Sequence, residues 1–229
     1  MYLGTFFVPG LVLIQICLLF RGQKKRRKKT ASAVAVLMVF ILSCTGCAGI
    51  EPEKRMYPLA MGVDVSEGEY ILTYAMPDLP RATGQGKEEE DGNQTLQVRG
   101  KSFEEIKSRY ERSQEKYLDI GHLQILILSQ DLTETDMWKD FFEYIREEPL
   151  AGENIYVFQT QEPEKLLGWK EGGTSVGEYI TGLMENRMDR EQKNGVTLRQ
   201  VYYQWYQNGT LKKLPKITLS EDQIQVWLE

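Results

Sequence analysis

The chain has 229 residues, of which 41% are hydrophobic and 27% are charged. Seven of its 28 Lys and Arg residues precede residue 30 and no acidic residue does, so residues 47–229 carry 21 basic against 33 acidic residues, a net charge of −12. Such an acidic body argues against nucleic-acid binding, which needs clustered positive charge, and against broad adhesion to anionic lipid.

Residues 1–20 form an apolar segment in front of a basic cluster at 21–30 (RGQKKRRKKT). Positive charge beside a membrane helix usually stays in the cytoplasm, so one interpretation is a transmembrane helix followed by a cytoplasmic loop. The other interpretation is that translation starts downstream, near Leu18 or Leu19. We favour the second, because a signal peptide begins with its positive charges.

The basic cluster is followed by twelve residues, Ala31 to Leu42, of which only Ser32 is polar, and then by the motif SCTGC at 43–47. Twelve residues span only about 18 Å as a helix, which is short for crossing a bilayer. Charges, an apolar run and a small-residue site in this order are typical of a secretory signal peptide. A cysteine directly after small residues resembles a bacterial lipobox, so we predict a signal segment at 1–46 and lipid attachment at Cys47.

Cys44 is the alternative attachment site, because the residues from Ile41 to Cys44 offer a second register of the same motif. A further alternative is that both cysteines are buried in a membrane helix. From Cys47 onward the chain has 183 residues, enough for one domain of ordinary size and a piece of another. We expect residues 47–56 to be a polar tether that holds this body just off the bilayer.

After the tether, two apolar runs at 59–65 and 69–76 surround Ser66-Glu67-Gly68 and predict a β-hairpin. Residues 77–94 are rich in Pro, Gly and acidic residues, which predicts a surface loop. A short strand is expected at 95–99. Ser102 and Glu105 then have the spacing of a capping box and predict the start of a helix.

Residues 123–128 (LQILIL) are the most apolar strand candidate, which predicts a central strand covered on both faces. Thr133 is expected to open a helix that ends before Pro149, because the residue before a proline avoids the helical region. A strand at 154–160 and a short helix at 163–167 follow. This alternation predicts an α/β (α+β) fold, a mixed β-sheet with helices packed on it, over residues 57–211.

Ser175 with Glu178 and Thr197 with Gln200 predict two more capped helices, the second ending at Asn208-Gly209. The Tyr and Trp side chains of the second helix have helical spacing, which favours a core role over an aromatic ligand platform. Two strands are expected at 216–219 and 223–228, leaving an open edge. We assign residues 212–229 to the start of a truncated second domain.

The residues indicate no enzyme. No cysteine follows Cys47, and the single histidine is His122, so disulfide frameworks and Cys/His zinc sites are not expected in the body, and neither is a metal or a cofactor. Catalysis by a Ser–His pair could use only His122. Paired carboxylates such as Glu147-Glu148 stand where solvated charge is the ordinary outcome, which disfavours a cell-envelope hydrolase.

The order of these features resembles the spore-germination lipoproteins of the Ger(x)C type, the C subunits of nutrient germinant receptors. The resemblance covers roughly residues 44–220 and departs from the family in the front segment and in the missing C-terminal domains. The matching motifs are Gly62-Val63-Asp64, Gly100-Lys101-Ser102-Phe103, Leu118 to Ile127 (LDIGHLQILI), Asp131-Leu132, Asp140-Phe141-Phe142 with Arg146, and Leu214-Pro215.

The resemblance implies a lipoprotein on the outer face of the spore inner membrane, without enzymatic activity. Its partners would be the membrane, through the lipid, and two integral-membrane receptor subunits, one of them transporter-like; direct binding of a small molecule is not expected. His122 is then a structural residue whose ring nitrogens bond to the backbone. The alternative function is a solute-binding lipoprotein of an uptake system.

Overall fold

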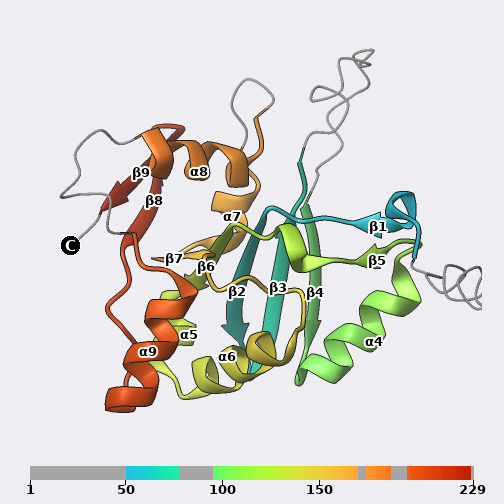
Figure 1. Cartoon of the computed structure of the whole chain (residues 1–229), viewed down its shortest axis with the longest axis horizontal. Helices are drawn as coiled ribbons and strands as arrows, with labels where there is room; N and C mark the ends of the chain where they lie inside the picture. The colour runs from blue at the N-terminus through green and yellow to red at the C-terminus, as the bar shows by residue number, and fades with distance from the viewer. Residues whose placement is uncertain (1–49, 78–94, 170–173, 187–194, 228–229) are drawn as a thin grey trace, which may run out of the picture. The chain divides into compact units, whose positions relative to one another are not determined.

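The computed structural model describes residues 50–77, 95–169, 174–186 and 195–227 (Figure 1). The chain divides into two compact units, Met1–Ile50 and Glu51–Glu229, and all the elements below belong to the second. The predicted signal segment, both candidate lipid-attachment cysteines and nearly all of the predicted loop at 77–94 lie outside the described residues.

A mixed sheet of seven strands, in the order β4-β3-β2-β6-β7-β8-β9, forms the centre of the second unit, and helices pack against it (Figure 1). The inner strands β2, β6, β7 and β8 run parallel, and antiparallel pairs stand at both ends. The predicted α+β fold is therefore confirmed. The strands of this sheet are β2 (Ala60–Ser66), β3 (Glu69–Ala75), β4 (Thr95–Gly100), β6 (Ile125–Ser129), β7 (Tyr156–Thr160), β8 (Lys216–Ser220) and β9 (Gln223–Trp227).

Helices cover both faces of the sheet. The core on one face is completed by α4, α6 and α9, and the core on the other by α7 and α8. Parallel neighbours need crossover connections, and these helices supply them. The helices are α4 (Phe103–Ser113), α5 (Gln130–Glu134), α6 (Met137–Glu147), α7 (Pro163–Leu167), α8 (Val176–Asn186) and α9 (Leu198–Asn208), with the 3-10 turns η1 (Pro52–Lys54) and η2 (Ile120–His122).

Strand β6 is buried on both faces, as its continuous apolar run predicts. Ile125 and Ile127 pack with α7 and α8, whereas Leu126 and Leu128 pack with the helices of the opposite face. All four side chains have no exposed surface. The alternation of a β-strand thus divides one apolar run between two cores.

The predicted hairpin at 59–76 is confirmed as β2 and β3. Its two central turn residues, Glu67 and Gly68, have φ angles of 52° and 77°, the left-handed pair that a tight two-residue hairpin needs. Gly62 on β2 lets α7 approach closely: a Cβ at this position would lie 2.5 Å from Leu167 Cδ1 and 3.2 Å from Pro163 Cβ.

The helix predicted to start at Thr133 is wrong in its boundary. The chain forms two helices here, because the buried Ser129 hydroxyl accepts the Leu132 N–H at 3.0 Å and starts α5 directly after β6. The second helix, α6, starts only at Met137. Its end is as predicted: Glu148, before Pro149, has the extended φ and ψ of −76° and 111°.

Most predicted helix caps are present. The Thr197 N–H donates to Gln200 Oε1 at 3.1 Å, and Gly209 ends α9 with φ of 70°. Ser175 and Glu178 cap α8 reciprocally. The box at Ser102 is only half formed, because the Glu105 carboxylate accepts from the Lys101 N–H instead of from the Ser102 N–H.

Strands β8 and β9 extend the main sheet at the end opposite to β4 (Figure 1). β8 pairs with β7 at a single register position, Gln159 with Lys216. The tight turn between β8 and β9 places Glu221 and Asp222 at φ angles of 50° and 60°. That residues 212–229 begin a separate domain stays a prediction.

Candidate interaction surfaces

The predicted attachment site, Cys47 or Cys44, lies outside the described residues, so its chemistry stays a prediction. None of the helices that the structure describes is both long and apolar enough to cross a bilayer. Within the same residues, no group of three or more His, Cys, Asp and Glu side chains could hold a metal ion. The surfaces that remain as candidates are three: the start of the folded body, helix α9, and a groove beside β7.

The folded body starts earlier than the expected tether 47–56 allows. Pro52–Lys54 form η1, and the next two residues form β1 (Arg55–Met56), which pairs in parallel with β5 (Tyr117–Leu118) (Figure 1). The Asp119 N–H donates to the Met56 carbonyl oxygen at 2.9 Å. We call η1, β1 and β5 the β1–β5 junction. The last residues of the expected tether are therefore part of the fold.

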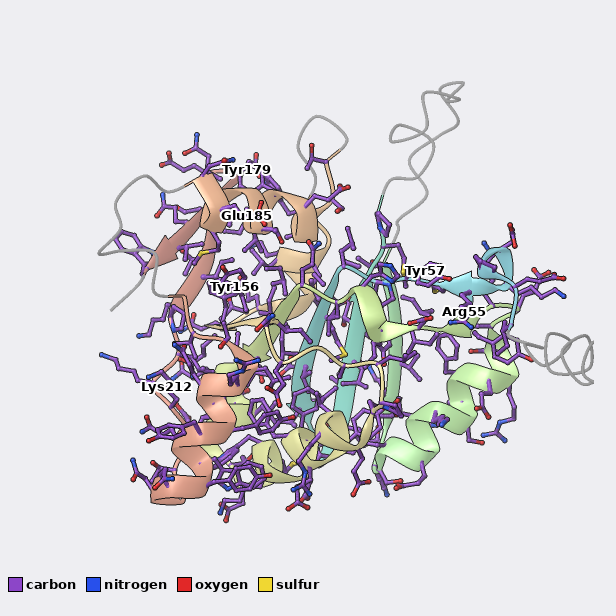
Figure 2. The ribbon with its side chains drawn as sticks, in the orientation of Figure 1. Arg55, Tyr57, Tyr156, Tyr179, Glu185 and Lys212 are labelled. Carbon is purple, nitrogen blue, oxygen red and sulfur yellow. The ribbon has the colours of Figure 1, made fainter. Side chains whose placement is uncertain are left out.

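An ion pair closes the β1–β5 junction. Arg55, labelled on β1 in Figure 2, places Nη1 2.6 Å from Asp119 Oδ2, and the Asp119 side chain is only 8% exposed. The other carboxylate oxygen accepts the Gly121 N–H at 2.9 Å. Burial by itself would raise the pKa of this carboxyl, but the Gly121 N–H and the Arg55 guanidinium together hold it below its usual value.

The junction is also fixed to the end of α4. The buried Tyr110 hydroxyl donates to the Lys116 carbonyl oxygen at 2.9 Å and lies 3.6 Å from Met56 Sδ. A side chain of α4 thereby contacts β1 and the residue directly before β5. Arg55, Tyr110 and Asp119 together hold β1 to a part of the chain more than fifty positions away, so the first folded residues are tied firmly to the body.

The expectation for His122 is corrected. Its side chain is exposed, not buried, because it stands at the end of η2, where the chain turns toward β6. Its ring meets the edge of the Tyr57 ring at a centroid distance of 4.9 Å and an angle of 76°. Tyr57, labelled in Figure 2, lies between β1 and β2. His122 packs on an aromatic ring at the surface.

Helix α9 divides its aromatic side chains between core and surface. Tyr202 is buried, and its hydroxyl donates to the Phe142 carbonyl oxygen at 3.0 Å. Tyr203 and Tyr206 are 70% and 58% exposed. Trp205 stacks on Tyr206 at 5.4 Å, and the Arg146 Nη1 donates to the Tyr206 hydroxyl at 2.8 Å. The core role predicted for this stripe holds for its inner half, whereas its outer half forms an aromatic surface.

A polar groove of about 290 Å³ lies at the carboxyl end of β7. It opens because β7 and β8 pair only at Gln159 and Lys216 and separate beyond them. Lys165 and Lys216 supply positive charge, and Lys165 Nζ lies 3.3 Å from Glu162 Oε2. Crevices at the carboxyl ends of parallel strands are common ligand sites in α/β sheets. No local sequence pattern predicts this groove, because it depends on where the pairing of two strands ends.

No curated protein and no solved structure matched the chain. The model of one family, described as the spore germination protein N-terminal domain, matches residues 49–219, which is most of the chain and nearly all of the second unit. This chain therefore belongs to the spore germination proteins of the Ger(x)C type, and residues 49–219 are their N-terminal domain.

Proposed function

We propose that this spore germination protein is a lipid-anchored, non-enzymatic subunit of a nutrient germinant receptor. It acts by assembling with integral-membrane subunits on the outer face of the spore inner membrane. The observation that carries the proposal is the position of the family domain, which begins at residue 49, two residues after a cysteine in a lipobox-like motif. A signal peptide, a lipid-attachment site and a germination domain thus follow one another without a gap.

The physical role of the lipid is to raise the effective concentration of the domain near its membrane-embedded partners. One acyl chain gives only marginal, reversible membrane binding, whereas two or more chains hold a protein stably. A domain held at the bilayer meets membrane-embedded partners at an effective concentration in the millimolar range or higher, as other short tethers do. Weak contacts between the domain and its partners are then sufficient for assembly.

The test compares Cys47→Ala with Cys44→Ala, a matched pair of substitutions three residues apart. We expect Cys47→Ala to abolish lipid attachment in mass spectra of the N-terminal peptide, to release the protein from membranes, and to remove its contribution to germination. Cys44→Ala should leave all three unchanged. Full germination with a protein that is wholly released from membranes would contradict the proposal, and the reverse pattern would assign the lipid to Cys44.

One observation favours the second candidate function, solute binding. The groove beside β7 has two lysine side chains, amide side chains such as Gln159, and a volume just below the usual range of ligand pockets. Isothermal titration calorimetry with amino acids and sugars would separate the two functions. A saturable isotherm that is lost in Lys216→Ala would favour solute binding, and flat isotherms would favour assembly.

A further inference from the structure

The residues that lead into the fold carry a small surface of their own. Its side chains are Glu51, Glu53 and Lys54 of the η1 region, and Lys116 and Tyr117 at the start of β5; all five are exposed. We call this set the anchor-proximal surface. Parallel pairing sets Tyr117 opposite Arg55, the residue directly after Lys54.

Electrostatic contacts link four of these side chains: Glu51, Glu53, Lys54 and Tyr117. Lys54 Nζ lies 2.9 Å from Glu51 Oε2. The pKa of the Lys54 ammonium is raised, first by its hydrogen bond with Glu51 and to a smaller extent by the nearby Tyr117 and Glu53 side chains. Residues from two segments more than sixty positions apart in sequence thus form one exposed patch.

Tyr117 is the one aromatic side chain of this set, and 56% of its surface is exposed. Its ring is not part of the buried core cluster, whereas the side chain of its neighbour Leu118 packs against that cluster. Tyrosine has an apolar ring and a polar tip, and it is enriched where a bilayer meets water. The two acidic and two basic side chains around Tyr117 cancel in formal charge, so neither repulsion from nor attraction to anionic lipid dominates.

The covalent chain limits how far this surface can stand from the lipid. Four consecutive Cα–Cα steps join Cys47 to Glu51, which is at most about 14 Å when fully extended. The interfacial region outside the hydrocarbon core is roughly 5–8 Å thick on each side of a bilayer. A lipid on Cys47 would therefore hold Glu51 and the rest of η1 at or just beyond the headgroups.

The β1–β5 junction carries this constraint into the body. Arg55 and Asp119 form their ion pair at 2.6 Å, and the Asp119 N–H bonds to the Met56 carbonyl oxygen. A position imposed on β1 would thus be shared by β5 and, through the hydrogen bond from Tyr110 to the Lys116 carbonyl oxygen, by α4. These contacts keep Tyr117 beside the first residues of the fold, because β5 pairs with β1.

We propose that the anchor-proximal surface rests on the bilayer, with the Tyr117 ring in the headgroup region, and that it orients the domain relative to the membrane. This inference rests on the lipid attachment proposed above. The surface that it contacts is a lipid bilayer, either neutral or anionic, because the two acidic and two basic side chains of the anchor-proximal surface balance in charge.

The experiment uses the full chain, produced in a host that lipidates it and reconstituted into vesicles. The body contains no cysteine after Cys47, so a single reporter can be placed by Tyr117→Cys, and the matched control is Tyr203→Cys, an exposed tyrosine on α9. Both are labelled with an environment-sensitive fluorophore. The unsubstituted protein, treated with the same label, measures the signal from any free thiol left at position 44 or 47. Quenching by aqueous iodide is measured in phosphatidylcholine vesicles and in vesicles that also contain phosphatidylglycerol.

We expect the iodide quenching constant at position 117 to fall severalfold on membranes, with little change at position 203. The fall should persist at high salt and in both vesicle types. Equal quenching at 117 and 203 in protein that floats with vesicles would overturn the inference and leave the anchor standing. Protein that does not float would overturn both. Protection at 117 that disappears with salt or without anionic lipid would also overturn it, because that behaviour requires a charged contact. Lys116→Cys, labelled in the same way, repeats the measurement if Tyr117→Cys does not fold.

Discussion

Removal of the Asp119 carboxylate should loosen the β1–β5 junction more than any other single change there. The carboxylate accepts two bonds, from Arg55 Nη1 at 2.6 Å and from the Gly121 N–H at 2.9 Å. Hydrogen bonds to charged groups contribute about 1.5–3 kcal/mol each. The Arg55 side chain is 29% exposed, so in Asp119→Ala its guanidinium can bond to water in place of the lost carboxylate. We therefore expect Asp119→Ala to lower the free energy of unfolding by about 3 kcal/mol, less than the full sum of the two bonds. Asp119→Asn keeps an acceptor for Gly121 and should lower it by about 1–2 kcal/mol.

The assay is urea denaturation of residues 47–229, followed by the fluorescence of their four Trp residues. The control is Glu153→Gln, which removes an exposed ion pair with Arg199 and should change stability by less than about 0.5 kcal/mol. Hydrogen exchange gives a local check, because the Asp119 amide bonded to Met56 should exchange faster while the Gln159 amide bonded to Pro215 should not. Wild-type stability in both Asp119 variants would refute a structural role for the junction.

The pH dependence of the same variants has a defined sign. The folded-state pKa of Asp119 lies below its ordinary value of 3.8. Its stabilising contribution is therefore fully present above pH 4 and is lost as the pH falls through the lower, folded-state pKa. As the pH falls through this range, the free energy of unfolding of Asp119→Asn should decrease by less than that of the wild type, because asparagine does not titrate. An identical pH profile in both proteins would contradict the assignment.

Three further substitutions test the packing around the sheet. Gly62→Ala should lower stability by about 1–3 kcal/mol through overpacking against Leu167 and Pro163, measured by urea denaturation. Gly209→Ala should lower the melting temperature through about 1 kcal/mol of strain at its left-handed φ of 70°, and no change would refute the cap at α9. Tyr202→Phe should lower the free energy of unfolding by about 1 kcal/mol because it removes the hydrogen bond from its hydroxyl to the Phe142 carbonyl oxygen, whereas Tyr203→Phe, on the exposed side, should be neutral.

The parts of the fold that could be predicted depend on local patterns. The apolar run of β6, the two-residue turn after β2 and the cap of α9 are each specified by residues within one turn or one strand. The boundary of α5 was missed for a related reason. Ser129 ends a buried strand and caps a helix at once, and apolar periodicity gives no sign of that double role.

The candidate surfaces were harder to predict than the fold because they depend on long-range pairing. Arg55 and Asp119 are 64 positions apart, and two-residue strands have no periodicity to detect. The chain before Met56 was therefore interpreted as a tether. The groove beside β7 depends likewise on where β8 leaves β7. His122 was expected, from the family resemblance, to be a structural residue bonded to the backbone, but it stands at the end of η2 with its side chain exposed.

A lengthened connection between lipid and body would separate attachment from orientation. An insertion of about 20 Gly and Ser residues after Gly49 adds a flexible reach of roughly 25 Å, more than the thickness of the headgroup region. The lipid proposed at Cys47 would still hold the protein, so flotation with membranes should be unchanged. The anchor-proximal surface is no longer forced onto the bilayer, so protection of a label at position 117 should fall, and the effective concentration for membrane partners should fall with it. We therefore expect slower germination with this insertion, while a rigid helical insertion that points the body away from the membrane should slow it further. Unchanged germination with the flexible insertion would mean that attachment alone is sufficient and that the firm β1–β5 junction serves only the stability of the fold.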